Sequence, residues 1–87
     1  MYEFTFNWGS WPFVIVDEEL EEKLMSQIDV ELRRDLVSWC DFMQANFNEE
    51  RGFSSDEAED WANIEYENLA LRLRSKGLTI TTDNWWS

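Results

Sequence analysis

Histidine is absent from this 87-residue sequence, and cysteine, proline and basic residues are scarce. Without histidine the chain lacks the commonest general base, the Ser-His and Cys-His nucleophile pairs, and the commonest ligand of zinc, copper and non-haem iron. The single cysteine, Cys40, has no partner for an intramolecular disulfide, and its apolar neighbours predict a buried, reduced thiol. These absences predict a protein that is not an enzyme and that binds no metal and no cofactor.

Other kinds of site and segment are missing as well. The three glycines are isolated, so no glycine-rich phosphate loop can form, and no apolar run approaches membrane-spanning length. The acidic run 17–22 lacks the alternating ligand spacing and the central glycine of a calcium loop. The N-terminus lacks the basic start and apolar run of a secretory signal. We therefore expect a cytoplasmic protein.

What the chain has in excess is negative charge and aromatic side chains. Nineteen acidic residues against seven basic ones give a formal net charge of -12, which repels nucleic acid and anionic membranes and favours a basic protein partner. Hydrophobic residues make up 44% and aromatic residues 16% of the sequence, whereas disordered acidic chains are poor in both. This composition predicts one folded domain over residues 1–87, which is a monomer when free.

Strand patterns occupy both ends of the chain. Tyr2, Phe4 and Phe6 alternate with polar residues, and after a turn the β-branched run 13–16 follows, which together predict a hairpin. Residues 78–83 alternate again and predict a final strand.

Helical patterns fill the middle. Asp17 is placed to cap a short acidic helix, Ser26 to start a second helix, and Ser54 or Ser55 to start the longest one, which Gly77 would end. The second helix has a core stripe of Ile28, Leu32, Leu36, Trp39, Cys40, Met43 and Phe47. The longest helix has a core stripe of Ala58, Ala62, Tyr66, Leu69, Ala70 and Leu73. The expected fold is therefore α+β: a small antiparallel sheet, made of the N-terminal hairpin and the C-terminal strand, packed against two main antiparallel helices and the short acidic helix.

The tryptophans divide between structural and exposed positions. Trp39 and Trp61 border the core stripes and are expected to close the core, while Phe42 lies off its stripe and needs another contact. Trp85 and Trp86 are adjacent in an extended segment, so their rings point to opposite sides. One of the two rings could be exposed and serve as an interface anchor. In the alternative, Trp8 and Trp11 of the predicted hairpin stack on Trp85 and Trp86.

The longest helix has a second face, roughly opposite its core stripe, that mixes carboxylates with aliphatic side chains. Its members are Asp56, Asp60, Asn63, Ile64, Glu67 and Leu71. As a docking surface, the two aliphatic residues would supply a desolvated centre and the carboxylates would pair with Lys or Arg of a partner. In the alternative, Ile64 and Leu71 pack under the first acidic helix or the sheet.

A set of residues between positions 28 and 80 carries a family resemblance. It consists of Leu36, Trp39 and Phe42 at three-residue spacing, Phe47, Gly52-Phe53-x-Ser55, Trp61, Leu69, Leu73 and Gly77-Leu78-Thr79-Ile80. This pattern resembles small acidic bacterial proteins, several of which look like immunity proteins of polymorphic or contact-dependent toxin systems. The N-terminal hairpin and the Trp-Trp end depart from that pattern, and the resemblance transfers no binding or catalytic residue.

The resemblance implies the same function as the charge does. An acidic inhibitor or immunity protein would bind and occlude a basic effector enzyme, for which a nuclease toxin is the model. Two alternatives stay open at the level of sequence. One is a phage or mobile-element inhibitor of a host defence enzyme that mimics nucleic acid, and the other is a structural adaptor subunit.

Overall fold

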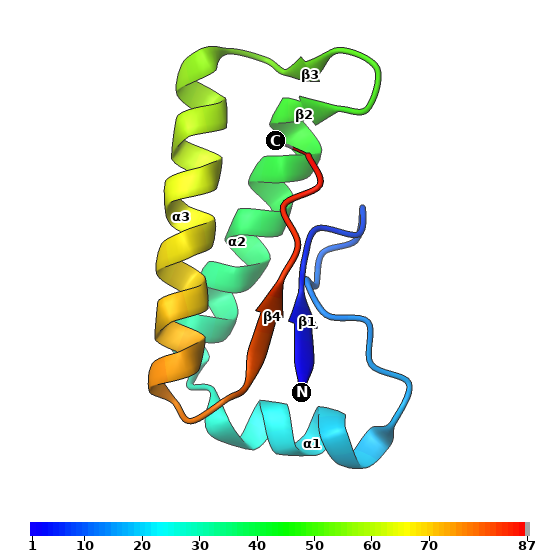
Figure 1. Cartoon of the computed structure of the whole chain (residues 1–87), viewed down its shortest axis with the longest axis vertical. Helices are drawn as coiled ribbons and strands as arrows, with labels where there is room; N and C mark the ends of the chain where they lie inside the picture. The colour runs from blue at the N-terminus through cyan, green and yellow to red at the C-terminus, as the bar shows by residue number, and fades with distance from the viewer. Residues whose placement is uncertain (87) are drawn as a thin grey trace.

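A computed structural model describes residues 1–86 as three helices and four short strands (Figure 1). In chain order the elements are β1 (Tyr2–Phe4), α1 (Glu18–Gln27), α2 (Val30–Asn46), β2 (Phe47–Asn48), β3 (Gly52–Phe53), α3 (Asp56–Ser75) and β4 (Ile80–Thr82). The helices α2 and α3 run side by side in opposite directions, β1 and β4 lie against this pair, and α1 crosses one end of the molecule (Figure 1). The predicted α+β class is confirmed.

The sheet differs from the predicted one. β1 pairs with β4 in parallel, with Tyr2 opposite Ile80 and Phe4 opposite Thr82, and residues 13–16 form no strand. The prediction of an antiparallel sheet from an N-terminal hairpin and a C-terminal strand is therefore wrong. A hairpin begins where the amide of Thr5 donates to the Pro12 carbonyl at 3.1 Å, but proline has no N–H to return and the ladder goes no further.

A second, antiparallel sheet lies at the opposite end of the helices from α1. β2 and β3 form a short hairpin with two residues in each strand, in which Phe47 is opposite Phe53. Gly52 has a φ of 78°, a left-handed conformation that glycine adopts without steric cost. This hairpin reverses the chain and sets α3 antiparallel to α2.

Each helix begins at a capping side chain. Asp17 and Ser55 cap α1 and α3, as the sequence predicted. The predicted start at Ser26 is wrong, because the Asp29 carboxylate accepts from the Leu32 amide at 2.7 Å and caps α2 instead. That hydrogen bond, aided by Lys76, lowers the pKa of Asp29. Ser26 lies in the last turn of α1, where its hydroxyl donates to the Lys23 carbonyl at 2.8 Å.

The two predicted core stripes are confirmed in full. Every member is buried, and Trp39, Leu32, Leu36, Met43, Leu69 and Leu73 are among the side chains with no exposed surface. The aromatic side chains of β1 complete this core, where the ring of Phe4 lies 4.4 Å from that of Tyr66 and 5.6 Å from that of Trp39 between centroids. Burial of large aromatic rings supplies much of the apolar area of so small a core.

The two C-terminal tryptophans lie in a turn and their rings contact each other at 5.9 Å between centroids, so the prediction that they point to opposite sides of an extended segment is wrong. Trp86 is 7% exposed and packs on Trp39, whereas Trp85 is 42% exposed. The Trp85 indole donates to the Phe6 carbonyl at 2.9 Å, and its ring lies 5.9 Å from that of Trp8. Trp8 therefore packs on one of the C-terminal tryptophans, and this contact joins the two ends of the described chain.

Tyr66 connects three parts of the fold through one hydroxyl. The hydroxyl donates to the Phe4 carbonyl and accepts from the Asp83 amide at 3.0 Å. Burial raises the pKa of Tyr66 to about 12, so the hydroxyl keeps its proton at neutral pH.

We expect Tyr66→Phe to lower the free energy of unfolding by about 1–3 kcal/mol, because Phe4 and Asp83 are left with unpaired backbone groups. Urea denaturation followed by circular dichroism measures the change. Tyr2→Phe is the matched control, since the Tyr2 hydroxyl makes one hydrogen bond, to the Leu20 carbonyl, in a partly buried place. Equal losses in the two variants would contradict the bridging role of Tyr66.

None of the helices within residues 1–86 combines the length and the apolar composition that crossing a membrane requires.

Candidate protein-binding face on α3

The face of α3 opposite its core stripe points to solvent along its whole length. We use the name α3 face for Asp56, Asp60, Ile64, Glu67 and Leu71, all of which are exposed. Ile64 and Leu71 are 61% and 62% exposed, so the alternative in which they pack under α1 or the sheet is wrong. The structure brings five of the six predicted residues to one exposed side of the helix, whereas Asn63 is half-buried and its side-chain oxygen accepts from the Trp86 indole at 2.9 Å.

The spacing of these residues makes a regular stripe. Asp60, Ile64, Glu67 and Leu71 follow one another at intervals of four, three and four residues, which keeps them in one row along the helix. Carboxylate and aliphatic side chains alternate in that row. Because they stand on a 20-residue helix packed on the core, their positions are fixed relative to one another.

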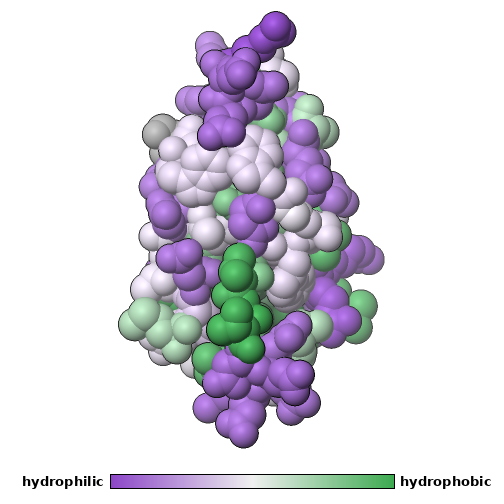
Figure 2. All heavy atoms as spheres, turned by 90° about the vertical axis from the view of Figure 1, so that its right-hand side faces the viewer, coloured by the Kyte–Doolittle hydropathy of each residue, from purple (hydrophilic) through white to green (hydrophobic). Residues whose placement is uncertain are grey.

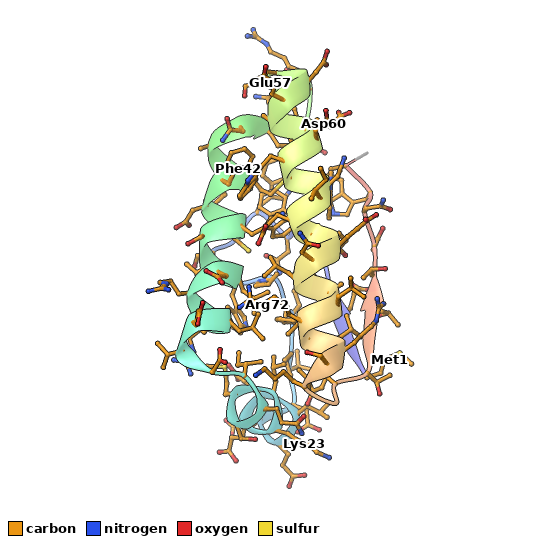
Figure 3. The ribbon with its side chains drawn as sticks, turned by 90° about the vertical axis from the view of Figure 1, so that its left-hand side faces the viewer. Met1, Lys23, Phe42, Glu57, Asp60 and Arg72 are labelled. Carbon is orange, nitrogen blue, oxygen red and sulfur yellow. The ribbon has the colours of Figure 1, made fainter. Side chains whose placement is uncertain are left out.

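The carboxylates of the α3 face have no counter-charge of their own. No basic residue occurs between Arg51 and Arg72, a stretch that holds six acidic residues. Within residues 1–86 there are two ion pairs, Arg72 to Asp35 at 2.8 Å and Lys76 to Asp29 at 3.4 Å, and both lie at the other end of the helix. Figure 3 shows Arg72 directed towards α2 and away from Asp60. The carboxylates of the α3 face therefore form no ion pair within the described residues.

A groove runs beside the C-terminal half of this face. It encloses about 370 Å³ between α3 and β4, with Glu67 and Leu71 on one wall and Thr82 on the other. Arg74 also lines the groove, but its guanidinium donates to the Ile80 carbonyl at 3.2 Å and so belongs to the scaffold. The groove gives the otherwise convex face a recess at its edge.

Trp61 extends the exposed surface, contrary to the position predicted for it from the sequence. It was expected to close the core, yet it is 45% exposed. Its ring is 4.3 Å from that of Phe42, which supplies the contact that Phe42 was expected to need. The sequence does hold a signal for this exposure, because Trp61 directly precedes the buried Ala62. Consecutive residues of a helix are rotated by about 100°, so the Trp61 side chain points well away from that of Ala62.

A second exposed apolar patch lies on another side of the molecule. Val14 and Val16 are 75% and 97% exposed beside the N-terminus of the acidic helix α1. Figure 2 shows hydrophobic atoms gathered there, directly above the hydrophilic end formed by α1. These valines stand in a segment without helix or strand, whereas the residues of the α3 face stand on a 20-residue helix.

Cys40 offers no reactive thiol in the folded state. Its side chain is buried, and burial together with the negative charge of Asp41 raises its pKa to about 12. At pH 8 the thiolate fraction is then about 10⁻⁴.

We expect iodoacetamide at pH 8 to label native Cys40 at least about 100-fold more slowly than the urea-unfolded chain, in which the thiol regains its ordinary pKa and full access. Mass spectrometry of quenched time points gives both rates. Labelling of the native protein as fast as of the unfolded chain would contradict the buried position of the thiol.

Among residues 1–86, no three acidic, cysteine or histidine side chains come together as metal ligands. No family model, curated protein or solved structure matches the chain.

Proposed function

We propose that this protein is an acidic inhibitor that binds a basic effector enzyme through the α3 face and occludes its active site. The observation that carries the proposal is the row Asp60, Ile64, Glu67 and Leu71, which is exposed and contains no ion pair. Carboxylates on such a row steer a cationic partner into place and pair with its Lys and Arg side chains. The aliphatic side chains between them lose water on binding and slow dissociation.

A nuclease toxin is the partner class that this face suits best. Nucleases hold phosphates in basic clefts, and a row of carboxylates on a convex helix can occupy such a cleft in place of the phosphates. With a net charge of -12, the protein has the opposite sign to such a cleft over most of its surface. The resemblance to immunity proteins of toxin systems supports the same partner class.

The test is reconstitution with the natural partner. The protein is used as bait in an extract of its host, the captured enzyme is purified, and its turnover is measured against increasing amounts of the protein. We expect activity to be lost at one equivalent and bound DNA or RNA to be displaced. Full activity in the saturated complex would contradict inhibition, and unchanged nucleic-acid occupancy would contradict occlusion of the active site.

A genetic test is independent of purification. If the protein is an immunity protein, deleting its gene beside an intact toxin gene should stop growth, and a catalytically dead toxin should restore it. Normal growth beside an active toxin would contradict the immunity role.

A further inference from the structure

An exposed aromatic pair stands beside the α3 face. The rings of Trp61 and Phe42 meet with their centroids 4.3 Å apart and their planes at 47°. Figure 3 shows Phe42 between α2 and α3 on the outer side of the helix pair. Phe42 is half-buried, while 45% of Trp61 is open to solvent. Tryptophan is the residue most enriched among interface anchors, because its large ring gives contact area with little loss of side-chain entropy.

The hydrogen bonding of Trp61 differs from that of the tryptophans that complete the core. The indoles of Trp39, Trp85 and Trp86 each donate to an oxygen of this chain at 2.9 to 3.0 Å. The indole N–H of Trp61 donates to no acceptor within residues 1–86. Both the ring and its donor are therefore open to a partner.

Two carboxylates flank this indole. Glu57 and Glu65 are four residues before and after Trp61, a spacing that brings side chains of one helix within about 6 Å of each other at Cβ. Neither glutamate forms an ion pair, and the nearest basic residue along α3, Arg72, is held by Asp35 at 2.8 Å. An open π face between two unpaired carboxylates is a concentrated region of negative potential.

We propose that Trp61, Phe42, Glu57 and Glu65 form a binding site for an arginine side chain of the partner. The inference rests on the proposed function, because it names the partner residue that anchors beside the α3 face. A planar guanidinium stacks on an indole and at the same time donates in its plane to carboxylates on either side. A lysine ammonium is a compact, strongly hydrated charge, which cannot stack and donate in this way.

The test is a titration of the whole protein with N-acetyl-arginine methylamide, followed through the indole N–H resonances of the six tryptophans by NMR. The Trp61→Phe variant identifies the Trp61 resonance. We expect this resonance to shift saturably, with a dissociation constant on the order of 10 mM, while the resonance of buried Trp39 stays in place. We expect N-acetyl-lysine methylamide to bind at least about three-fold more weakly. The absence of a saturable shift, or equal affinity for the two compounds, would overturn the proposal.

Paired variants separate this site from general charge attraction. We expect Glu57→Gln with Glu65→Gln to weaken binding of the arginine compound several-fold. Glu18→Gln with Glu22→Gln makes the same charge change on α1 and should leave the affinity unchanged. Equal weakening by both pairs would mean that net charge alone attracts the compound, and would overturn the site.

The titration contains no effector enzyme, so its outcome is separate from that of the inhibition experiment. A null titration removes the arginine site and leaves inhibition through the α3 face to be judged by turnover. An effector enzyme that stays fully active would contradict the proposed function, while a positive titration would still place guanidinium binding at Trp61.

Discussion

Replacement of Trp39 by alanine should lower the free energy of unfolding by about 3–5 kcal/mol. Trp39 has no exposed surface, and its ring lies 5.2 Å from that of Tyr66, 5.5 Å from that of Trp86 and 5.6 Å from that of Phe4. The variant also loses the hydrogen bond from the indole to the Ala62 carbonyl at 3.0 Å. Small domains are stable by only about 5–15 kcal/mol in total, so this variant should be marginally folded.

Urea denaturation followed by far-ultraviolet circular dichroism measures the loss, because fluorescence changes when a tryptophan is removed. Trp61→Ala is the matched control: it deletes the same side chain from a site that is 45% exposed, and should lower stability by about 1 kcal/mol. If the two variants were equally destabilised, Trp39 would not be the centre of the core.

The second large effect concerns the rate of partner binding. We expect Asp60→Lys with Glu67→Lys to slow association with a basic partner about 10- to 100-fold at low salt, because the double variant reverses the steering charge on the α3 face. Both side chains are exposed, so the free energy of unfolding should change little. The difference from the parent protein should shrink as salt is added, since counter-ions screen exposed charges.

Stopped-flow or surface-based kinetics over a salt series measures this rate. Glu18→Lys with Glu22→Lys on α1 makes the same change in net charge and serves as the control, with a smaller effect expected. Equal slowing by both pairs would show that total charge, rather than the α3 face, steers the partner. Ile64→Ala and Leu71→Ala should act instead on the dissociation rate, because they remove apolar contact and leave the charge intact.

The helices of this protein could be predicted from the sequence because their signals are local. A core stripe can be recognised from the helical period alone. The members of the two predicted stripes, which run from Ile28 to Phe47 and from Ala58 to Leu73, are therefore buried as predicted. The start of α2 was misplaced because Ser26 and Asp29 both carry a capping pattern. Only the fold shows that Asp29 holds the Leu32 amide while Ser26 still belongs to α1.

The sheet could not be predicted in the same way, because alternation identifies a strand but not its partner. Tyr2 and Phe4 are buried as their pattern requires, yet they pair with residues 80–82 and not with the segment nearest in sequence. Pro12 precedes the β-branched run, and its missing N–H stops the hairpin ladder after one hydrogen bond.

The candidate site was partly visible in the sequence. The period that places the core stripe also places its opposite face, so Ile64 and Leu71 are exposed among carboxylates. Trp61 was assigned to the core because large aromatic rings generally prefer the interior. That preference does not predict the contact between the Trp61 ring and the ring of Phe42 on α2. Contacts between helices depend on the packing of the whole domain.

The parallel pairing of β1 with β4 also sets when the protein can fold. Residues 2–4 pair with residues 80–82, and the ring of Trp39 packs against that of Trp86. The residues that make these contacts are far apart in the sequence. During translation β1 must wait, with its aromatic side chains uncovered, until β4 has left the ribosome. The acidic residues synthesised in between keep the unfinished chain strongly charged, which opposes its aggregation during that interval.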